Sequence, residues 1–525
     1  MRTIWQEKGI EKSVISPVSL IITAFTPVKD VRKTVTPELK NQPDSTLLLV
    51  DLGGGKNRLG GSALAQVYGQ IGQSAPDIDD AALLGGFFKA TQTLVEEELL
   101  LAYHDRSDGG LFTTVAEMAF AGRKGVDLLM DCIAGDHEEV LAALFSEEAG
   151  AVIQVANEHV EAVKAAYANA GLEAHLHHVG ELNNDDAVRV RLGGGIVFEA
   201  ERLALQQQWS ATSYHMQKRR DNPACAEEEW QGMAADNNSG LNGLALTFPM
   251  AENPVADLVS KSEQSPRVAI LREQGTTGHT ELAAAFHRAG FVAVDVHMSD
   301  IEAKRVNLTG FRGLALAGGS TFGDVLGAGT AWAQKILRNN DLKASFQDFF
   351  QRSDTFTFAV GNGAQMLVQL KHLIPGASHW PTFVANRSNQ FEARVVLAEV
   401  VPSPSIFFKG MEGSRLPVPV GHGQGRAQFG MESTLEDCQA EGQLALRFVD
   451  SEGNATMHYP ANPNGSEGGA TGFTSTDGRI TALLPHPERV FRVVQHSWYP
   501  EEWKGQEDAP WMRIFRNARR WVEEN

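Results

Sequence analysis

The chain has little of what disulfide-bonded or membrane-spanning proteins require. Its 525 residues include three cysteines, Cys132, Cys225 and Cys438, which lie far apart without a CxxC spacing. Neither a disulfide framework nor a thiolate metal site is therefore expected. No stretch reaches the roughly 18 to 20 apolar residues of a membrane span, and the first dozen residues contain no apolar signal region. We expect a cytoplasmic protein without a membrane partner.

Positive charge is also scarce. The 46 lysines and arginines are outnumbered by 65 aspartates and glutamates, which gives a formal net charge of −19 at pH 7. Binding to a phosphate backbone depends on clustered basic residues that release counterions, so nucleic acid is not an expected partner. An apolar content of 42% and a charged content of 21% are typical of globular proteins. The length predicts roughly two to four domains.

Residues 1–205 alternate between strand-like and helix-like patterns. Strands are expected at 19–23, 46–51, 99–104, 126–130, 151–155 and 175–179, and helices at 81–98, 111–121, 138–145 and 160–170. The last helix is followed by Gly171, a typical C-terminal cap. This alternation predicts one α/β or α+β domain.

Residues 206–263 differ in character, because polar runs without a clear period are interrupted by the aromatic residues Trp209, Tyr214 and Trp230. We interpret this segment as an ordered linker that lies over a surface. Residues 264–525 then predict a doubly wound, flavodoxin-like parallel sheet, because strand and helix patterns alternate in βαβ units of about 30 to 50 residues. Strands are expected at 267–272, 292–296, 313–317 and 479–484, and helices at 280–289, 331–337, around Phe346 and at 511–522.

The stretch 355–374 has the pattern of a nucleophile elbow. A short β-type run that ends at Val360 meets a tight glycine turn, and an apolar-periodic helix follows. An elbow presents one side chain at a helix N-terminus, where N–H groups lower a thiol pKa and stabilise an oxyanion. Ala364 stands at the expected nucleophile position, and alanine can carry out none of this chemistry.

The segment 485–490 (PHPERV) contains a second candidate. Alternation along a strand would point His486 and Glu488 to the same side, so that the carboxylate could fix one tautomer of the imidazole. The structural alternative is a loop histidine beside a surface carboxylate. The presence of an elbow and an HxE motif in one flavodoxin-like domain favours a catalytic pair.

These motifs resemble one family. The elbow followed by PHPERVF (485–491), the glycine-rich stretch 318–329 and the start RVAILREQG (267–275) resemble the class I glutamine amidotransferase domain of the large bacterial phosphoribosylformylglycinamidine synthase. Segments 386–394, 459–466 and 508–519 fit the same family, and 103–110 and 116–122 resemble the end of its second synthase lobe. The resemblance implies an ATP-dependent carbon–nitrogen ligase of purine biosynthesis, which converts formylglycinamide ribonucleotide to the amidine with ammonia from glutamine.

The resemblance implies roles for five residues of the amidotransferase domain. His486 matches the catalytic base and Glu488 its orienting carboxylate, while Ala364 matches the cysteine nucleophile. Gly319 and Gln365 fall in the oxyanion and glutamine pocket. The family elbow reads roughly CNGCQM and this one reads GNGAQM, so no thiol remains in the turn. We therefore expect no glutaminase activity.

In the synthase part, Asp105 matches a magnesium ligand and Ser107 a nucleotide contact, so ATP and Mg²⁺ are the implied cofactors. A carboxylate suits a hard cation, and a hydroxyl with glycine N–H groups suits phosphate oxygens. The structural alternative is a helix-capping turn with Asp108 as the N-cap. The glycine runs at 53–55 and 60–61 lack the GxxxxGK[ST] spacing, and we interpret them as structural turns, with a contribution to the synthase cleft as the alternative.

By the resemblance, the chain starts at an internal position of the full-length family protein. The N-terminal domain, the first synthase lobe and part of the second would then be absent, which implies a separate N-terminal synthase half as a partner. Three hypotheses follow: a split synthase that uses free ammonia, a catalytically inactive remnant or scaffold protein, and a surviving glutaminase or other hydrolase. The third is disfavoured, because removal of a triad nucleophile typically costs on the order of 10⁶ in turnover.

Overall fold

The chain folds into two domains. In the first, the central strand of the sheet has an apolar core on each of its two faces. The computed structural model describes residues 2–15, 22–239, 243–258, 265–430 and 433–525. In β3 (Ser45–Asp51), Leu47 and Leu49 face one core while Leu48 and Val50 face the other. Such a continuous apolar run is typical of a strand covered on both sides.

The sheet around β3 has seven strands in the order β4-β6-β3-β7-β5-β8-β9. Its other strands are β4 (Ala102–Asp105), β5 (Gly125–Leu129), β6 (Gly150–Ala156), β7 (Leu176–Asn183), β8 (Ala187–Leu192) and β9 (Gly195–Glu201). Helices α2 (Ala81–Glu96) and α5 (Val160–Asn169) cover one face, and α3 (Gly110–Gly122) and α4 (His137–Phe145) cover the other. Neighbours pair antiparallel except β5 and β8, so the domain is of the α+β type.

The predicted elements from residue 46 to 179 are confirmed, although β4 begins three residues later than expected. The strand predicted at 19–23 falls in part outside the described residues, and 22–23 are not in a strand. The sequence reasoning missed α1 (Ala63–Val67) and two hairpins, β1–β2 (Arg2–Glu7, Ile10–Ile15) and β8–β9. The second had a readable signal, because Gly193 and Gly194 at φ 58° and 77° form the two-residue turn that favours glycine.

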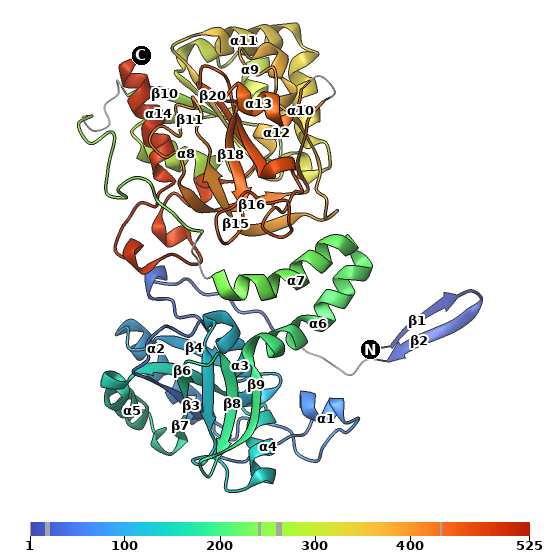
Figure 1. The fold of residues 1–525 in the computed structure, drawn as a ribbon, viewed down its shortest axis with the longest axis vertical. Helices are drawn as coiled ribbons and strands as arrows, with labels where there is room; N and C mark the ends of the chain where they lie inside the picture. Colours follow the sequence, from blue (N-terminus) through green and yellow to red (C-terminus); the bar gives the residue numbers. More distant parts are fainter. Residues whose placement is uncertain (1, 16–21, 240–242, 259–264, 431–432) are drawn as a thin grey trace.

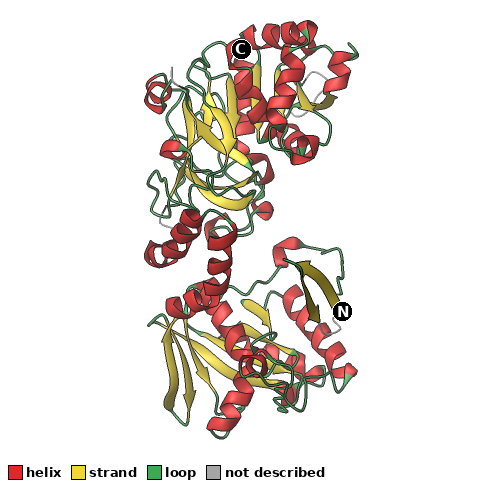
Figure 2. Cartoon of the chain, turned by 90° about the vertical axis from the view of Figure 1, so that its right-hand side faces the viewer, coloured by secondary structure: helices red, strands yellow, loops and turns green. Residues whose placement is uncertain are grey.

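Two helices join this domain to the second one (Figures 1 and 2). The stretch expected as an ordered linker begins inside α6 (Arg202–Arg220) and continues into α7 (Pro223–Ser239). Their surfaces are too polar for the apolar stripe that marks a surface helix, so periodicity alone did not reveal them. Among the described helices, none is both long and apolar enough to cross a membrane.

The second domain contains a nine-stranded sheet in the order β11-β10-β12-β13-β20-β19-β18-β15-β16. The strands are β10 (Arg267–Arg272), β11 (Val292–His297), β12 (Gly313–Leu316), β13 (Phe356–Val360), β15 (Glu392–Val400), β16 (Arg415–His422), β18 (Leu444–Val449), β19 (Ala470–Thr474) and β20 (Ile480–Leu483). The strands from β11 to β20 are parallel in a flavodoxin-like order, as predicted. The remaining strands pair antiparallel, which the prediction of a parallel sheet did not include.

Helices cover both faces of this sheet. They are α8 (His279–Arg288), α9 (Met298–Glu302), α10 (Ala328–Leu337), α11 (Asn340–Gln351), α12 (Asn362–Gln369), α13 (Leu435–Ala440) and α14 (Met512–Glu524), while β14 (Thr382–Ala385) and β17 (Gln424–Gln428) form a separate pair. Phenylalanines fill the core between β13, α8 and α14. The ring of Phe358 lies 4.8 Å from that of Phe407, and Phe286 lies 5.1 Å from Phe515. This core fixes β13, the strand that leads to the elbow.

Candidate functional site

The elbow has the strand–turn–helix geometry that the sequence predicts. All residues of β13 are buried, and Gly361 follows at φ 50° and ψ −121°. Its N–H donates to the Leu483 carbonyl at 3.1 Å, and its carbonyl accepts from the Gln365 N–H at 3.0 Å as α12 begins. Residues that carry a side chain rarely adopt this backbone conformation. A residue in such a conformation between a strand and a helix is typical of a nucleophile elbow.

The neighbouring strand brings the histidine to the elbow. β20 lies parallel to β13, with Val360 opposite Leu483, so the chain that leaves β20 reaches the same sheet edge. His486 is 1% exposed and Glu488 is fully buried, and the imidazole Nδ1 shares a 2.7 Å hydrogen bond with the carboxylate. The two do not alternate along a strand as expected, because a 3₁₀ turn from Pro487 to Arg489 brings them together.

The residue that faces the free nitrogen of this pair is Gly361. A Cβ built on Gly361 would lie 3.0 Å from His486 Nε2 and 2.6 Å from Cε1. Ala364, by contrast, is fully buried in α12 within the apolar core on one side of the sheet. The structure therefore does not bring Ala364, the predicted nucleophile position, to the histidine, because that side chain lies almost one helical turn past the tip of the elbow and packs into the core.

Gly319 and Gln365 also lie around the elbow. Gly319 has φ 92°, its carbonyl accepts from the Thr277 N–H at 2.9 Å, and a Cβ on it would lie 2.7 Å from Thr277 Oγ1. The Gln365 amide is already engaged, since its nitrogen donates to the Gln424 carbonyl at 2.6 Å and its oxygen accepts from Asn362 at 3.0 Å. Neighbouring atoms thus leave no room for a side chain at Gly319, while Gln365 stabilises the surrounding loops.

The sequence reasoning assigned no role to two polar groups beside the pair. His422 is buried and shares a 2.6 Å hydrogen bond with Asn464, and burial lowers the pKa of His422 to about 4, so the ring stays neutral. Arg489 lies next to the glycine turn, with Nη2 3.3 Å from the position of a Cβ on Gly319. The buried Arg489 Nε has no hydrogen-bond partner among the described residues. Arg489 is the last residue of the motif PHPER (485–489), so the sequence could have identified it as a site residue.

The predicted nucleotide turn lies between β4 and α3. Asp105 and Ser107 are exposed, and the Asp105 carboxylate accepts a hydrogen bond from the Tyr103 hydroxyl at 2.5 Å. The N-cap of α3 is Gly109 at φ 82°, not Asp108, so the capping alternative does not hold. Glu147 supplies the acceptor instead, since its carboxylate accepts from the Gly109 N–H at 2.9 Å.

Among the described residues, the side chains around Asp105 do not form a complete magnesium site. Mg²⁺ requires near-octahedral coordination by oxygen ligands. Within the part of the chain that the structure describes, no group of three or more His, Cys, Asp or Glu side chains could hold a metal ion. Asp105 therefore contributes at most one ligand, and the residues here do not fit a complete Mg²⁺ site by themselves.

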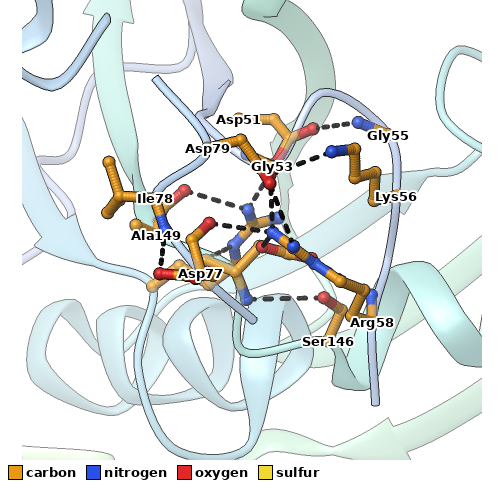
Figure 3. Close-up of polar contacts among 12 residues, drawn as sticks. Asp51, Gly53, Gly55, Lys56, Arg58, Asp77, Ile78, Asp79, Ser146 and Ala149 are labelled. Atoms are coloured by element: carbon orange, nitrogen blue, oxygen red, sulfur yellow. Dashed lines mark hydrogen bonds and ion pairs between the residues drawn. The ribbon is translucent and has the colours of Figure 1, made fainter. Parts of the chain in front are cut away.

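The glycine loop after β3 is tied down by its own neighbours (Figure 3). The Asp51 carboxylate accepts hydrogen bonds from the N–H groups of Gly53 at 3.1 Å and Gly55 at 2.7 Å. Lys56 forms an ion pair with Asp79 at 3.0 Å. The amides and the lysine that a phosphate loop would direct at a ligand are thus engaged, which favours the interpretation as structural turns.

Two family models match the chain, one in each of its two domains. Residues 265–522 match the model of the CobB/CobQ-like glutamine amidotransferase domain, and residues 42–193 match that of the AIR synthase related protein, C-terminal domain. A structure of PurLQS from Thermotoga maritima is 20% identical, covering 49% of this chain and 98% of that one, with a TM-score of 0.36. A structure of T. maritima PurL complexed with ATP is 16% identical. The match covers 33% of this chain and 27% of that one, with a TM-score of 0.27.

The chain spans about a quarter of the T. maritima PurL that it matches. The two domain matches follow one another on a single chain. The chain therefore joins a domain of the AIR synthase-related C-terminal type to a CobB/CobQ-like glutamine amidotransferase domain.

Proposed function

We propose that this chain is the C-terminal part of a phosphoribosylformylglycinamidine synthase that uses free ammonia instead of glutamine. The observation that carries the proposal is the glycine at the tip of the elbow. Gly361 faces Nε2 of His486 and has no side chain that the histidine could deprotonate. A His–Glu pair without a nucleophile cannot form the acyl-enzyme intermediate of amide transfer.

None of the three cysteines supplies a replacement thiolate. Burial raises the pKa of Cys438 to about 12, and it raises the pKa values of Cys225 and Cys132 as well. A nucleophilic cysteine requires the opposite shift, because the thiolate is the reactive form. The amidotransferase domain is therefore a structural element that binds the synthase part without hydrolysing glutamine.

The synthase chemistry would be shared with an N-terminal synthase half on another polypeptide segment. ATP is the proposed nucleotide, since T. maritima PurL is known as a complex with ATP. Asp105 and Ser107 would form one wall of the nucleotide site, and most magnesium ligands would come from the other half. ATP would transfer its γ-phosphate to the glycinamide carbonyl oxygen of formylglycinamide ribonucleotide and leave as ADP, and ammonia would then displace that oxygen as inorganic phosphate to give the amidine. We expect the protein in the cytoplasm.

Turnover with two nitrogen donors tests this proposal. The full chain is mixed with the N-terminal synthase half, formylglycinamide ribonucleotide and Mg-ATP, and ADP release is followed with ammonium chloride or with glutamine. We expect turnover with ammonium and none with glutamine. Turnover with glutamine would contradict the proposal, and so would ammonia release from glutamine by the chain alone.

A non-catalytic scaffold is the second candidate, and the elbow without a nucleophile at Gly361 favours it. In that case the two parts would associate, as seen by sedimentation, but neither nitrogen donor would support turnover. The variant Asp105→Ala provides the control. It should abolish turnover if Asp105 contacts the nucleotide and leave the association unchanged.

A further inference from the structure

A cavity of about 440 Å³ lies at one edge of the seven-stranded sheet in the first domain. Strand β7 runs antiparallel to both β3 and β5, so its start meets the ends of these two strands. The cavity lies where they meet. Its lining includes Asp51 at the end of β3, His175 and His177 around the start of β7, and Cys132 beyond the end of β5. Pockets that hold small molecules have volumes of roughly 300–1,000 Å³, so this cavity is large enough for one.

A buried arginine with an unused nitrogen lines this cavity. Arg106 follows Asp105 in the chain, but its side chain is only 1% exposed, whereas Asp105 lies at the surface. The Arg106 Nε donates to the Glu148 carbonyl at 2.6 Å, and Nη2 donates to the Asp51 carboxylate at 2.5 Å and to the Ala149 carbonyl at 3.1 Å. Its Nη1 has no hydrogen-bond partner among the described residues. Because a buried charged group without all its acceptors costs free energy, an acceptor from a ligand would be stabilised here.

The lining offers further donors but no free carboxylate. Among the described residues that line the cavity, Asp51 is the one acidic side chain. Both of its oxygens are occupied, since Oδ1 also accepts from the Gly53 N–H at 3.1 Å and Oδ2 accepts from the Gly55 N–H at 2.7 Å. The side chains of Asn57 and His177 have no hydrogen-bond partner within the described part of the chain. The groups that remain for a ligand are therefore mainly N–H donors.

The two histidines lie close to the arginine. His175 Nδ1 donates to the Asp51 carbonyl at 2.6 Å, which leaves Nε2 for a ligand. Burial lowers the pKa of His177, and Asp51 opposes this effect, while His175 and Arg106 add to it. All three groups are thus within electrostatic reach of the His177 ring, which is neutral at pH 7 when the cavity is empty.

We propose that this cavity binds a small organic anion, a phosphate ester or a carboxylate, whose acidic group is held by Arg106 Nη1 and His177. An anion fits because hydrogen bonds from a guanidinium to phosphate or carboxylate oxygens are among the strongest in proteins. Leu49, Ile133 and Ala143 add apolar surface to the lining, which suits the carbon skeleton of such a ligand. The site is independent of the proposed synthase activity, because it uses neither Asp105 nor the elbow.

Protection of Cys132 tests the proposal, because this thiol lines the cavity and is exposed, whereas Cys225 and Cys438 are buried. The full chain is labelled with N-ethylmaleimide in the presence of ribose 5-phosphate, succinate or inorganic phosphate, each up to about 10 mM, and peptide mass spectrometry follows the labelling. We expect ribose 5-phosphate or succinate to slow the labelling of Cys132 about three- to tenfold. Protection by the first identifies a phosphate-ester site, and protection by the second a carboxylate site. If neither protects, or if inorganic phosphate alone protects, the proposal is overturned.

His177→Gln and His178→Gln form a matched pair of variants. The two residues are neighbours on β7, but side chains alternate along a strand, and the exposed His178 does not line the cavity. We expect His177→Gln to raise the half-protecting concentration about tenfold, the effect of one hydrogen bond to a charged group. His178→Gln should leave that concentration unchanged. Equal effects of the two variants would place the anion elsewhere and overturn the proposal.

A further variant decides if His177→Gln unfolds the domain, which labelling of the buried Cys225 and Cys438 would reveal. Asn57 has φ 46°, a conformation that glycine adopts readily, so Asn57→Gly removes the amide without backbone strain. It should weaken the protection of Cys132 about threefold, and an unchanged protection in this variant would then contradict the proposal. ATP serves as the last probe. Protection by ATP with the same dependence on His177 would make the cavity part of the nucleotide site and would also overturn the proposal.

Discussion

We expect Gly361→Cys to restore a reactive thiol and weak hydrolysis of glutamine, whereas Ala364→Cys should restore neither. The Cβ of Gly361→Cys would lie 2.6 Å from His486 Cε1, about 0.8 Å inside the 3.4 Å at which ordinary contacts begin. Such overpacking costs about 1–3 kcal/mol. Holding a non-glycine residue at φ 50° costs a further 1–3 kcal/mol, roughly. We therefore expect the free energy of unfolding to fall by about 2–6 kcal/mol.

The thiol of Gly361→Cys would stand at the start of α12 and face His486 Nε2. A helix N-terminus and a neighbouring imidazole both stabilise a thiolate, so its pKa should fall below the ordinary value of about 8.5. Ala364→Cys places its sulfur in a fully buried core position, where the thiol pKa should rise. The pair of variants therefore separates the two positions by the sign of the shift.

The assay is iodoacetamide alkylation of the full chain as a function of pH, resolved by peptide mass spectrometry because Cys132 is exposed. Ammonia release from glutamine is measured on the same samples. We expect low-pH alkylation and weak ammonia release from Gly361→Cys only. If Ala364→Cys acquired the reactive thiol instead, the assignment of Gly361 to the tip of the elbow would be wrong.

Three further perturbations have defined outcomes. Glu488→Ala should lower the urea-measured stability by about 1–3 kcal/mol, because it leaves the buried Nδ1 of His486 without a partner. His422 has a folded pKa of about 4, below its unfolded value near 6.5, so wild type should lose roughly 3 kcal/mol as the pH falls through this window, and His422→Gln should lose less. Phe358→Ala should cost about 3–5 kcal/mol in thermal unfolding, while the exposed control Phe391→Ala should stay within about 0.5 kcal/mol.

Local patterns predicted most elements because their signals lie in contiguous residues. The run that ends at Val360, the glycine turn and the periodic helix after it specify an elbow wherever the chain folds. The proximity of His486 to this elbow followed from the expected parallel sheet, and β20 does lie beside β13. The sequence patterns did not predict the hairpin of α6 and α7, because side-chain pairs such as Glu227 with Lys218 stabilise it in place of an apolar stripe.

Contiguous residues were enough to specify the two-sheet organisation, the elbow, the His486–Glu488 motif and the absence of a thiol from the turn. Tertiary packing settled which residue of the elbow faces the histidine. Gly361 and Ala364 are three residues apart, and the packing of α12 directs the second into the core while the turn leaves the first against His486 Nε2. The fold also showed that, among the described residues, Asp105 has too few neighbouring carboxylates for a metal site. Both results depend on residues that meet only after folding, so no local pattern could contain them.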